Sequence, residues 1–395
     1  MKKLIINQSV KHNKVSIIVL IAAAVIFFAT LFLIYSEDIL KVEEDIFNVY
    51  GDEVVEFEKA TVTEIVKEEL ETDEIAENAY VGSQELTVIV KSGRYKGETM
   101  TAYNFMGPLS GGVVSAGDGV VLTIKTHANG EIYATVYESN RIPYLVIFII
   151  LFFIAVVLIG RGTGLKSMVG LAFTILCLFT ILIPLVLKGA PPVITTFGIC
   201  AYIALVCFTI LGGVQRKTIS AFLGTVSGAF FAMVFGLTAQ YLAKIDGYRL
   251  EDAEALLQLK YNEMTNISIR GLMTASIIIC ALGAVMDVAM SISSALEEIH
   301  AANPSLKRND LFKSGMNIGR DMVGTMTNTL ILAFLGSEFT LIIFIYSRGL
   351  TFYHLFSTAF VSMETISGIA SSIGMVLAIP LTALISSALI SGKKR

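Results

Sequence analysis

The sequence predicts a membrane all-α helical bundle of about eight transmembrane helices, joined to one extracytoplasmic all-β, OB-like domain. Hydrophobic residues make up 54% of the chain and charged residues only 16%, whereas an ordinary soluble domain carries about 25% charged residues. The missing charge is concentrated in apolar runs of about twenty residues, the length that crosses a bilayer. A polar segment with strand-like alternation lies between the first two runs.

The N-terminal segment combines a basic tail with an apolar run. Residues 1–14 contain several lysines, and the apolar run at 15–35 contains no charged residue. This run is longer than the roughly 7–15 apolar residues of a signal peptide, and no small-residue cleavage site closes it. We therefore expect an uncleaved transmembrane anchor at 15–35, with residues 1–14 as a cytoplasmic tail.

The extracytoplasmic domain is expected at 36–141. Its acidic first half, 43–77, lacks the spacing of a calcium loop and is interpreted as a solvated spacer followed by a first strand. Strand-like runs lie at 54–66, 85–91, 98–106, 119–125 and 131–137. The Asn129-Gly130 pair predicts a hairpin turn. Short strands without room for crossover helices predict a small OB-like barrel, and an open β-sandwich fragment is the alternative.

The remaining apolar runs form the expected transmembrane domain at 142–392, of about seven helices. They lie at 142–160, 167–187, 193–213, 218–242, 270–296, 322–346 and 366–391. Lys and Arg gather in the alternate loops that would face the cytoplasm and at the C-terminus, 393–395. This bias predicts that both termini are cytoplasmic. In the loop 297–319, Asn303-Pro304 predicts a short helix that starts there and ends near Gly319.

Several classes of function have no support in the sequence. The net charge of −4 gives no basic field for nucleic acid. The four cysteines lie inside apolar runs, where small hydrophobic side chains are the usual reading. The segment 160–167 resembles a phosphate loop but has Leu165 where glycine is required before Lys-Ser. We therefore predict no catalytic residue, no metal site and no cofactor, and we do not expect an enzyme.

Polar residues in the sixth and seventh predicted spans are the main candidates for a functional site. Asp287 lies ~14 Å and Asn328 ~12 Å from the cytoplasmic ends of their spans at 1.5 Å per residue. In an antiparallel pair these depths predict a polar seam of facing side chains: Asp287, Ser291 and Ser294 on one span, and Arg320, Asp321, Thr325 and Asn328 on the other. A buried acid favours an ion or proton path. The alternative is a structural polar clamp.

Small residues predict close helix packing elsewhere. Gly224 and Gly228 in the fifth span form a small-xxx-small pattern, which lets another helix approach closely. The last span has a similar stripe that includes Gly374.

Four segments make the sequence similar to the YibE/F family of bacterial membrane proteins. They are SGRYKG at 92–97, GAVMDVAMSISSA at 283–295, SGMNIGRDMVGTMTNTLIL at 314–332 and GMVLAIPLT at 374–382. The resemblance implies a multi-pass protein of the bacterial cell membrane. It implies no reaction and no substrate.

Two functions remain open. The first is transport of an ion or small solute through the polar seam. The second is a non-transporting scaffold or envelope assembly factor, whose outer β-domain binds an envelope partner. The expected partners are the lipid bilayer and either an ion or small solute or an envelope component at the outer domain. No nucleic acid is expected, and the sequence does not determine the oligomeric state. No internal inverted repeat is visible, which weakens a standard secondary-transporter fold.

Overall fold

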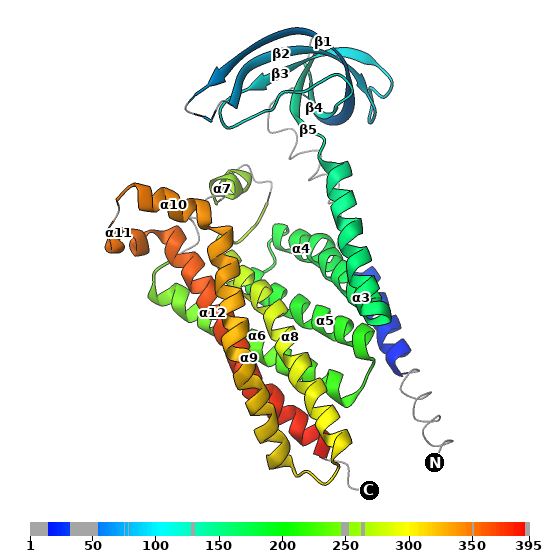
Figure 1. Cartoon of the computed structure of the whole chain (residues 1–395), viewed down its shortest axis with the longest axis vertical. Coiled ribbons are helices and arrows are strands. Elements are labelled where there is room, and N and C mark those ends of the chain that lie inside the picture. The colour runs from blue at the N-terminus through cyan, green and yellow to red at the C-terminus, as the bar shows by residue number, and fades with distance from the viewer. Residues whose placement is uncertain are drawn as a thin grey trace. The chain divides into compact units, whose positions relative to one another are not determined.

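The chain contains two compact units, Asp38–Leu158 and Met1–Glu37 with Ile159–Arg395. We call the first the barrel unit and the second the helical unit, and each is described by itself (Figure 1). The computed structural model describes residues 15–31, 54–74, 76–77, 79–127, 131–245, 253–261, 265–349 and 351–391. Helix α3 (Ile142–Cys177) begins in the barrel unit and continues into the helical unit.

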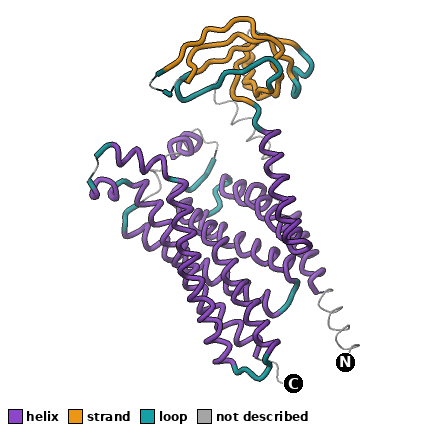
Figure 2. Tube along the Cα trace, viewed as in Figure 1, coloured by secondary structure: helices purple, strands orange, loops and turns teal. Residues whose placement is uncertain are grey.

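The barrel unit is a closed five-stranded barrel with strand order β1-β2-β3-β5-β4 (Figure 2). Its strands are β1 (Val54–Asp73), β2 (Ala79–Val90), β3 (Thr99–Met106), β4 (Gly119–Thr126) and β5 (Ile132–Ser139). The contact between β3 and β5 is parallel, and the other pairs are antiparallel. Each strand-like run in the sequence has a strand counterpart, and closure excludes the open sandwich. The predicted Asn129-Gly130 turn lies outside the described residues, although Thr126 pairs with Ile132 beside it.

The described part of the acidic stretch forms a strand that is longer than the predicted run 54–66. Strand β1 continues to Asp73, which pairs with Ala79 at the start of β2, so the two strands extend as a ribbon. Gly82 has a φ of +135°, and a Cβ atom there would lie 2.0 Å from the carbonyl oxygen of Glu69. Strand propensity did not predict this extension, because glutamate is depleted in strands. The extension forms because its residues pair with β2 across the ribbon.

The barrel core contains a polar network beside its apolar residues. Leu86, Val88 and Leu122 are fully buried. Next to them, the Oε1 atom of Gln84 accepts hydrogen bonds from Asn104 Nδ2 (2.9 Å) and Val114 N (3.1 Å). Gln84 Nε2 donates to the carbonyl oxygen of Val114 (3.1 Å) and to Glu68 (3.0 Å). The amide is therefore satisfied on both sides, as burial requires.

The helical unit consists of helices with short connections. After α3 come a π-helical turn (Leu178–Leu182), α4 (Ile183–Leu187), α5 (Pro192–Gly212), α6 (Arg216–Leu242), α7 (Ala253–Tyr261), a 3₁₀ turn (Ile269–Gly271), α8 (Leu272–Ala302), α9 (Arg308–Ser337), α10 (Phe339–Ser347), α11 (Phe352–Ser357) and α12 (Ala359–Ser391). Among the described residues, five helices are long and apolar enough to cross a membrane, or six if α9 and α10 form one bent span. A shorter apolar helix spans Val15–Leu31.

The N-terminal helix Val15–Leu31 packs within the helical unit. Tyr202 of α5 donates a hydrogen bond from its hydroxyl to the carbonyl oxygen of Ala23 (2.6 Å). Phe27 lies against Phe173, with ring centroids 5.9 Å apart. The backbone nitrogen of Val214 donates to Ser16 Oγ (2.8 Å). These contacts attach the N-terminal helix to α3 and α5 along its length.

Two predicted elements differ from the structure. The span predicted at 322–346 is not one continuous helix, because α9 ends at Ser337 and α10 is bent from it by 62° at Glu338. The predicted short helix from Pro304 to Gly319 is wrong. Helix α8 runs to Ala302, and α9 starts at Arg308 and continues through Gly319. Glycine does not end α9 because it fits a close helix contact there: a Cβ on Gly319 would lie 2.1 Å from Ile379 Cγ2.

Helices α6, α8 and α12 form the centre of the helical unit. Gly228 of α6 approaches Gly374 of α12 so closely that a Cβ on either glycine would lie 2.9 Å from the other's carbonyl oxygen. A Cβ on Gly224 would meet Thr382 Oγ1 at 2.0 Å. The structure thus brings Gly224, Gly228 and Gly374 together where two backbones nearly touch, as small residues permit in membrane helices.

Candidate functional site

One side of α8 carries only small or polar residues although it is exposed. The exposed positions of its central part repeat at helical spacing and are Ser276, Cys280, Gly283, Asp287 and Ser291. Ser294 continues this line and is half-buried. The opposite side is buried and apolar, with Val285, Val288 and Ile292 fully covered. We call the exposed side the α8 polar face.

Helix α9 has a second polar face. Asp321, Thr325 and Asn328 are exposed on it, and Gly324 lies between them. A Cβ atom on Gly324 would meet no heavy atom within 4 Å, and the same holds for Gly283 on the α8 polar face. Both faces therefore border open space, in contrast to the tightly covered glycines of α6 and α12.

The predicted seam residues lie on these two faces without bonding across them. Among the described residues, Asp287, Ser291 and Ser294 make no hydrogen bond to Asp321, Thr325 or Asn328. The Thr325 hydroxyl donates to the carbonyl oxygen of Met322 on its own helix (3.1 Å). Arg320 lies 3.4 Å from Asn317 Oδ1 and forms no ion pair with Asp321. In contrast, the neighbouring Ser293 is buried, and its Oγ atom lies 3.0 Å from Ser386 Oγ of α12 in a hydrogen bond.

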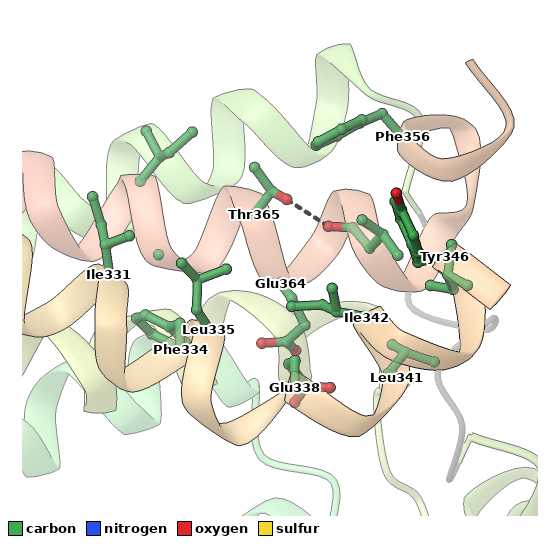
Figure 3. A pocket seen from close by; sticks show the side chains of 14 residues that line it. Ile331, Phe334, Leu335, Glu338, Leu341, Ile342, Tyr346, Phe356, Glu364 and Thr365 are labelled. Atoms are coloured by element: carbon green, nitrogen blue, oxygen red, sulfur yellow. Dashed lines mark hydrogen bonds between the residues drawn. The ribbon is translucent and has the colours of Figure 1, made fainter. Parts of the chain in front are cut away.

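A pocket of about 420 Å³ between α9, α10 and α12 was not predicted. Its wall is apolar except for two carboxylates and the hydroxyls of Tyr346 and Thr365 (Figure 3). It is lined by Ile331, Phe334, Leu335, Glu338, Leu341, Ile342, Ile345, Tyr346, Phe356, Val361, Glu364, Thr365, Gly368 and Ile369. We call it the acidic pocket.

The acidic pocket lies further along α9 than its tightest contacts with α12. A Cβ on Gly315 would lie 2.9 Å from Ala383 Cβ, and Gly319 is covered by Ile379, so the two helices touch near the start of α9. Further along, Phe334 still packs on Gly368, where a Cβ would lie 3.3 Å from Phe334 Cδ2, and the side chains of Ile331 and Ile369 line hollows beside this contact. The break at Glu338 then turns α10 away from the line of α9.

Two carboxylates from different helices meet in this pocket. Glu364 of α12 points toward Glu338 at the break (Figure 3), and their charges interact. Both side chains are half-buried, and within the described part of the chain neither forms a hydrogen bond or an ion pair. Thr365 does not donate a hydrogen bond to either carboxylate, because its hydroxyl donates to the carbonyl oxygen of Val361 (2.7 Å). Two adjacent carboxylates in an apolar site hold a shared proton or a cation more readily than two free charges.

Glu338 could have been found in the sequence. It is an acid inside the apolar run 322–346, and an ionisable residue within such a run is a candidate functional residue in its own right. Its partnership with Glu364 could not be read from the sequence, because it depends on the bend between α9 and α10.

No metal centre emerges from the described ranges. They contain no group of three or more His, Cys, Asp or Glu side chains placed to hold an ion. Cys177, Cys200, Cys207 and Cys280 are free thiols.

Comparison with known proteins identifies the helical part of the chain. A family model described as YibE/F-like protein matches residues 148–392. This range contains the α8 polar face and the acidic pocket. No curated protein and no solved structure gives a significant match.

Proposed function

This chain belongs to the YibE/F-like family of proteins, and we propose that it transports an ion or small solute across the bacterial cell membrane along the polar faces of α8 and α9. The proposal places α8 and α9 side by side as the sixth and seventh of about eight spans. Asp287 is the group that changes protonation or takes the ion. Asp321 and Asn328 line the same path.

One observation carries this proposal: Asp287 lies on a helix face whose exposed positions are all small or polar, with the half-buried Met286 and Met290 at its edge. Facing lipid, a charged aspartate at a helix centre costs roughly 2.5–3.5 kcal/mol. The polar face is therefore expected to border water, and a water-filled path beside a carboxylate suits a cation. The open space over Gly283 and Gly324 supports the same reading.

The proposed topology has both termini in the cytoplasm and the barrel outside. The helical stretch Ile142–Leu187 has 46 residues, which at 1.5 Å per residue is about 70 Å, more than twice a bilayer core of about 30 Å. It is non-helical at Arg161, with φ 48° and ψ −129°, between the two predicted runs. These features support two spans within that stretch. The closed five-stranded order of the barrel supports an OB-like domain.

Purified protein in sealed lipid vesicles tests the transport proposal. Proton, Na⁺ and K⁺ fluxes are measured for the native chain, for Asp287→Asn and for Glu298→Gln. The second variant is the matched control, because Glu298 is also exposed on α8 but lies near its cytoplasmic end. We expect flux of one cation in the native and control proteins and its loss in Asp287→Asn. A fully active Asp287→Asn protein would refute the role of Asp287, and absence of all flux in the native protein would refute cation transport.

The scaffold alternative also has a supporting observation. On the outside of the barrel, the rings of Tyr103 and Tyr133 stack with centroids 5.6 Å apart, and Phe105 continues the row at 6.4 Å from Tyr103. They border a hollow of about 710 Å³. Exposed aromatic rows of this kind favour binding. If scaffolding is the function, Tyr103→Ala should abolish crosslinking of an envelope component at position 105, and the native protein should show no flux.

A further inference from the structure

The acidic pocket is large enough for a small organic molecule and is closed mainly by hydrocarbon. Its volume of about 420 Å³ lies within the roughly 300–1,000 Å³ typical of small-molecule sites. Phe334, Leu335 and Ile342 contribute from α9 and α10, and Ile369 contributes from α12. Among the described lining residues, the two glutamates are the only ones whose side chains carry a charge when ionised at neutral pH.

Charge determines which class of molecule fits. An anion is repelled by Glu338 and Glu364, and a neutral apolar molecule leaves both carboxylates without compensation. A bare divalent ion is poorly served as well, because Ca²⁺ takes about 6–8 oxygen ligands and this pocket supplies two carboxylates. A positively charged organic molecule satisfies both requirements, since its apolar body matches the walls and its charge matches the acids.

Aromatic rings strengthen this match. Phe334, Tyr346 and Phe356 all line the pocket, and the face of an aromatic ring attracts a cation by roughly 0.5–2 kcal/mol. A quaternary or fully alkylated cation, which cannot donate hydrogen bonds, gains most from such surroundings.

The shape of the site indicates a ligand that comes from the bilayer. A second apolar hollow of about 430 Å³ adjoins the pocket and shares Ile331 and Ile369 with it. Together they follow the gap between α9 and α12. Leu335 and Ile342 in the wall are exposed on the outside of the helical unit, so in a membrane this gap lies next to lipid.

From these observations we propose that the acidic pocket is a binding site for a hydrophobic organic cation. The apolar body of the ligand lies against α9, α10 and α12, and its charge lies between Glu338 and Glu364. This inference does not depend on the transport proposal, because the site uses neither the α8 polar face nor Asp287.

Binding to the purified full-length protein in detergent tests the proposal. The probe is tetraphenylphosphonium, a hydrophobic cation, and the comparison is tetraphenylborate, an anion of nearly the same size and shape. Affinity is measured by isothermal titration calorimetry for the native chain, Glu338→Gln, Glu364→Gln, the double variant and the control Asp287→Asn. Empty micelles give the background of partitioning.

We expect the native protein and Asp287→Asn to bind the cation and not the anion. Each single glutamine variant should bind about tenfold more weakly, and the double variant should lose binding above the micelle background. Equal binding of cation and anion would overturn the proposal, as would a folded double variant with native affinity. A native protein that binds the cation but shows no flux in vesicles would count against the transport proposal alone.

Discussion

Replacing Gly228 by alanine adds one methyl group at the closest approach of α6 and α12. The new Cβ would lie 2.7 Å from Val285 Cγ1, 2.8 Å from Ala378 Cβ and 2.9 Å from the carbonyl oxygen of Gly374. All three distances are shorter than a normal contact, and the carbonyl belongs to a backbone that cannot rotate away. Overpacking of this kind costs about 1–3 kcal/mol, and the better helix propensity of alanine returns about 0.5–1 kcal/mol. The expected net loss is therefore about 0–2.5 kcal/mol.

Gly283→Ala is the matched control for this substitution. Gly283 also lies within a helix of the same unit, but a Cβ there meets nothing within 4 Å, so only the propensity gain of about 0.5–1 kcal/mol remains. Thermal unfolding of the full-length protein in detergent measures both variants. Tm should fall for Gly228→Ala and stay level or rise for Gly283→Ala. If Gly228→Ala proves as stable as Gly283→Ala, the backbones of α6 and α12 are not held in rigid contact, and the packing argument fails.

Two further predictions follow from the barrel and from the topology. Gln84→Ala leaves Asn104 and the Val114 amide without their shared acceptor, which should destabilise the barrel by about 1–3 kcal/mol. Amide deuterium exchange at Val114 should therefore be faster in this variant but not in the control Glu85→Ala, which lies on the same strand. Unchanged exchange in Gln84→Ala would show that the barrel does not need this network. Ser83→Cys should react with an impermeant thiol reagent added outside cells in a background free of native cysteines, and Ser305→Cys only after permeabilisation. Labelling of Ser305→Cys in intact cells would contradict the proposed topology.

The barrel was predictable because its pattern is local. Alternation of apolar and polar residues, such as Leu86 and Val88 against Glu85 and Thr87, identifies a strand without knowledge of its partner. The ribbon formed by the end of β1 and the start of β2 was not predicted, because a segment rich in glutamate is typical of a solvated spacer. Its pairing is visible only once both strands are in place.

The site was less predictable because it depends on helix rotation and helix ends. Spacing alone placed Asp287 and Ser291 on one face of α8, but which neighbour that face meets depends on how α8 packs against α6 and α12. Glu338 was missed because hydropathy averages over the run 322–346 and a single acid does not interrupt it. Gly319 was predicted to be a helix end, because glycine ends many helices. In the structure it instead lets the side chain of Ile379 pack directly on the backbone of α9.

The uneven contact along α9 divides the helical unit into a fixed part and a freer part. Near its start, α9 is pressed onto α12 at Gly315 and Gly319, and α12 is itself locked to α6 through paired glycines. Beyond this point Phe334 still contacts α12 at Gly368, but apolar hollows lie beside this contact on the side of α9 and α10 that faces α12. A displacement of α10 therefore changes the distance between Glu338 and Glu364 without disturbing the α6–α12 contact. We therefore expect occupancy of the acidic pocket to depend on the angle of the broken span.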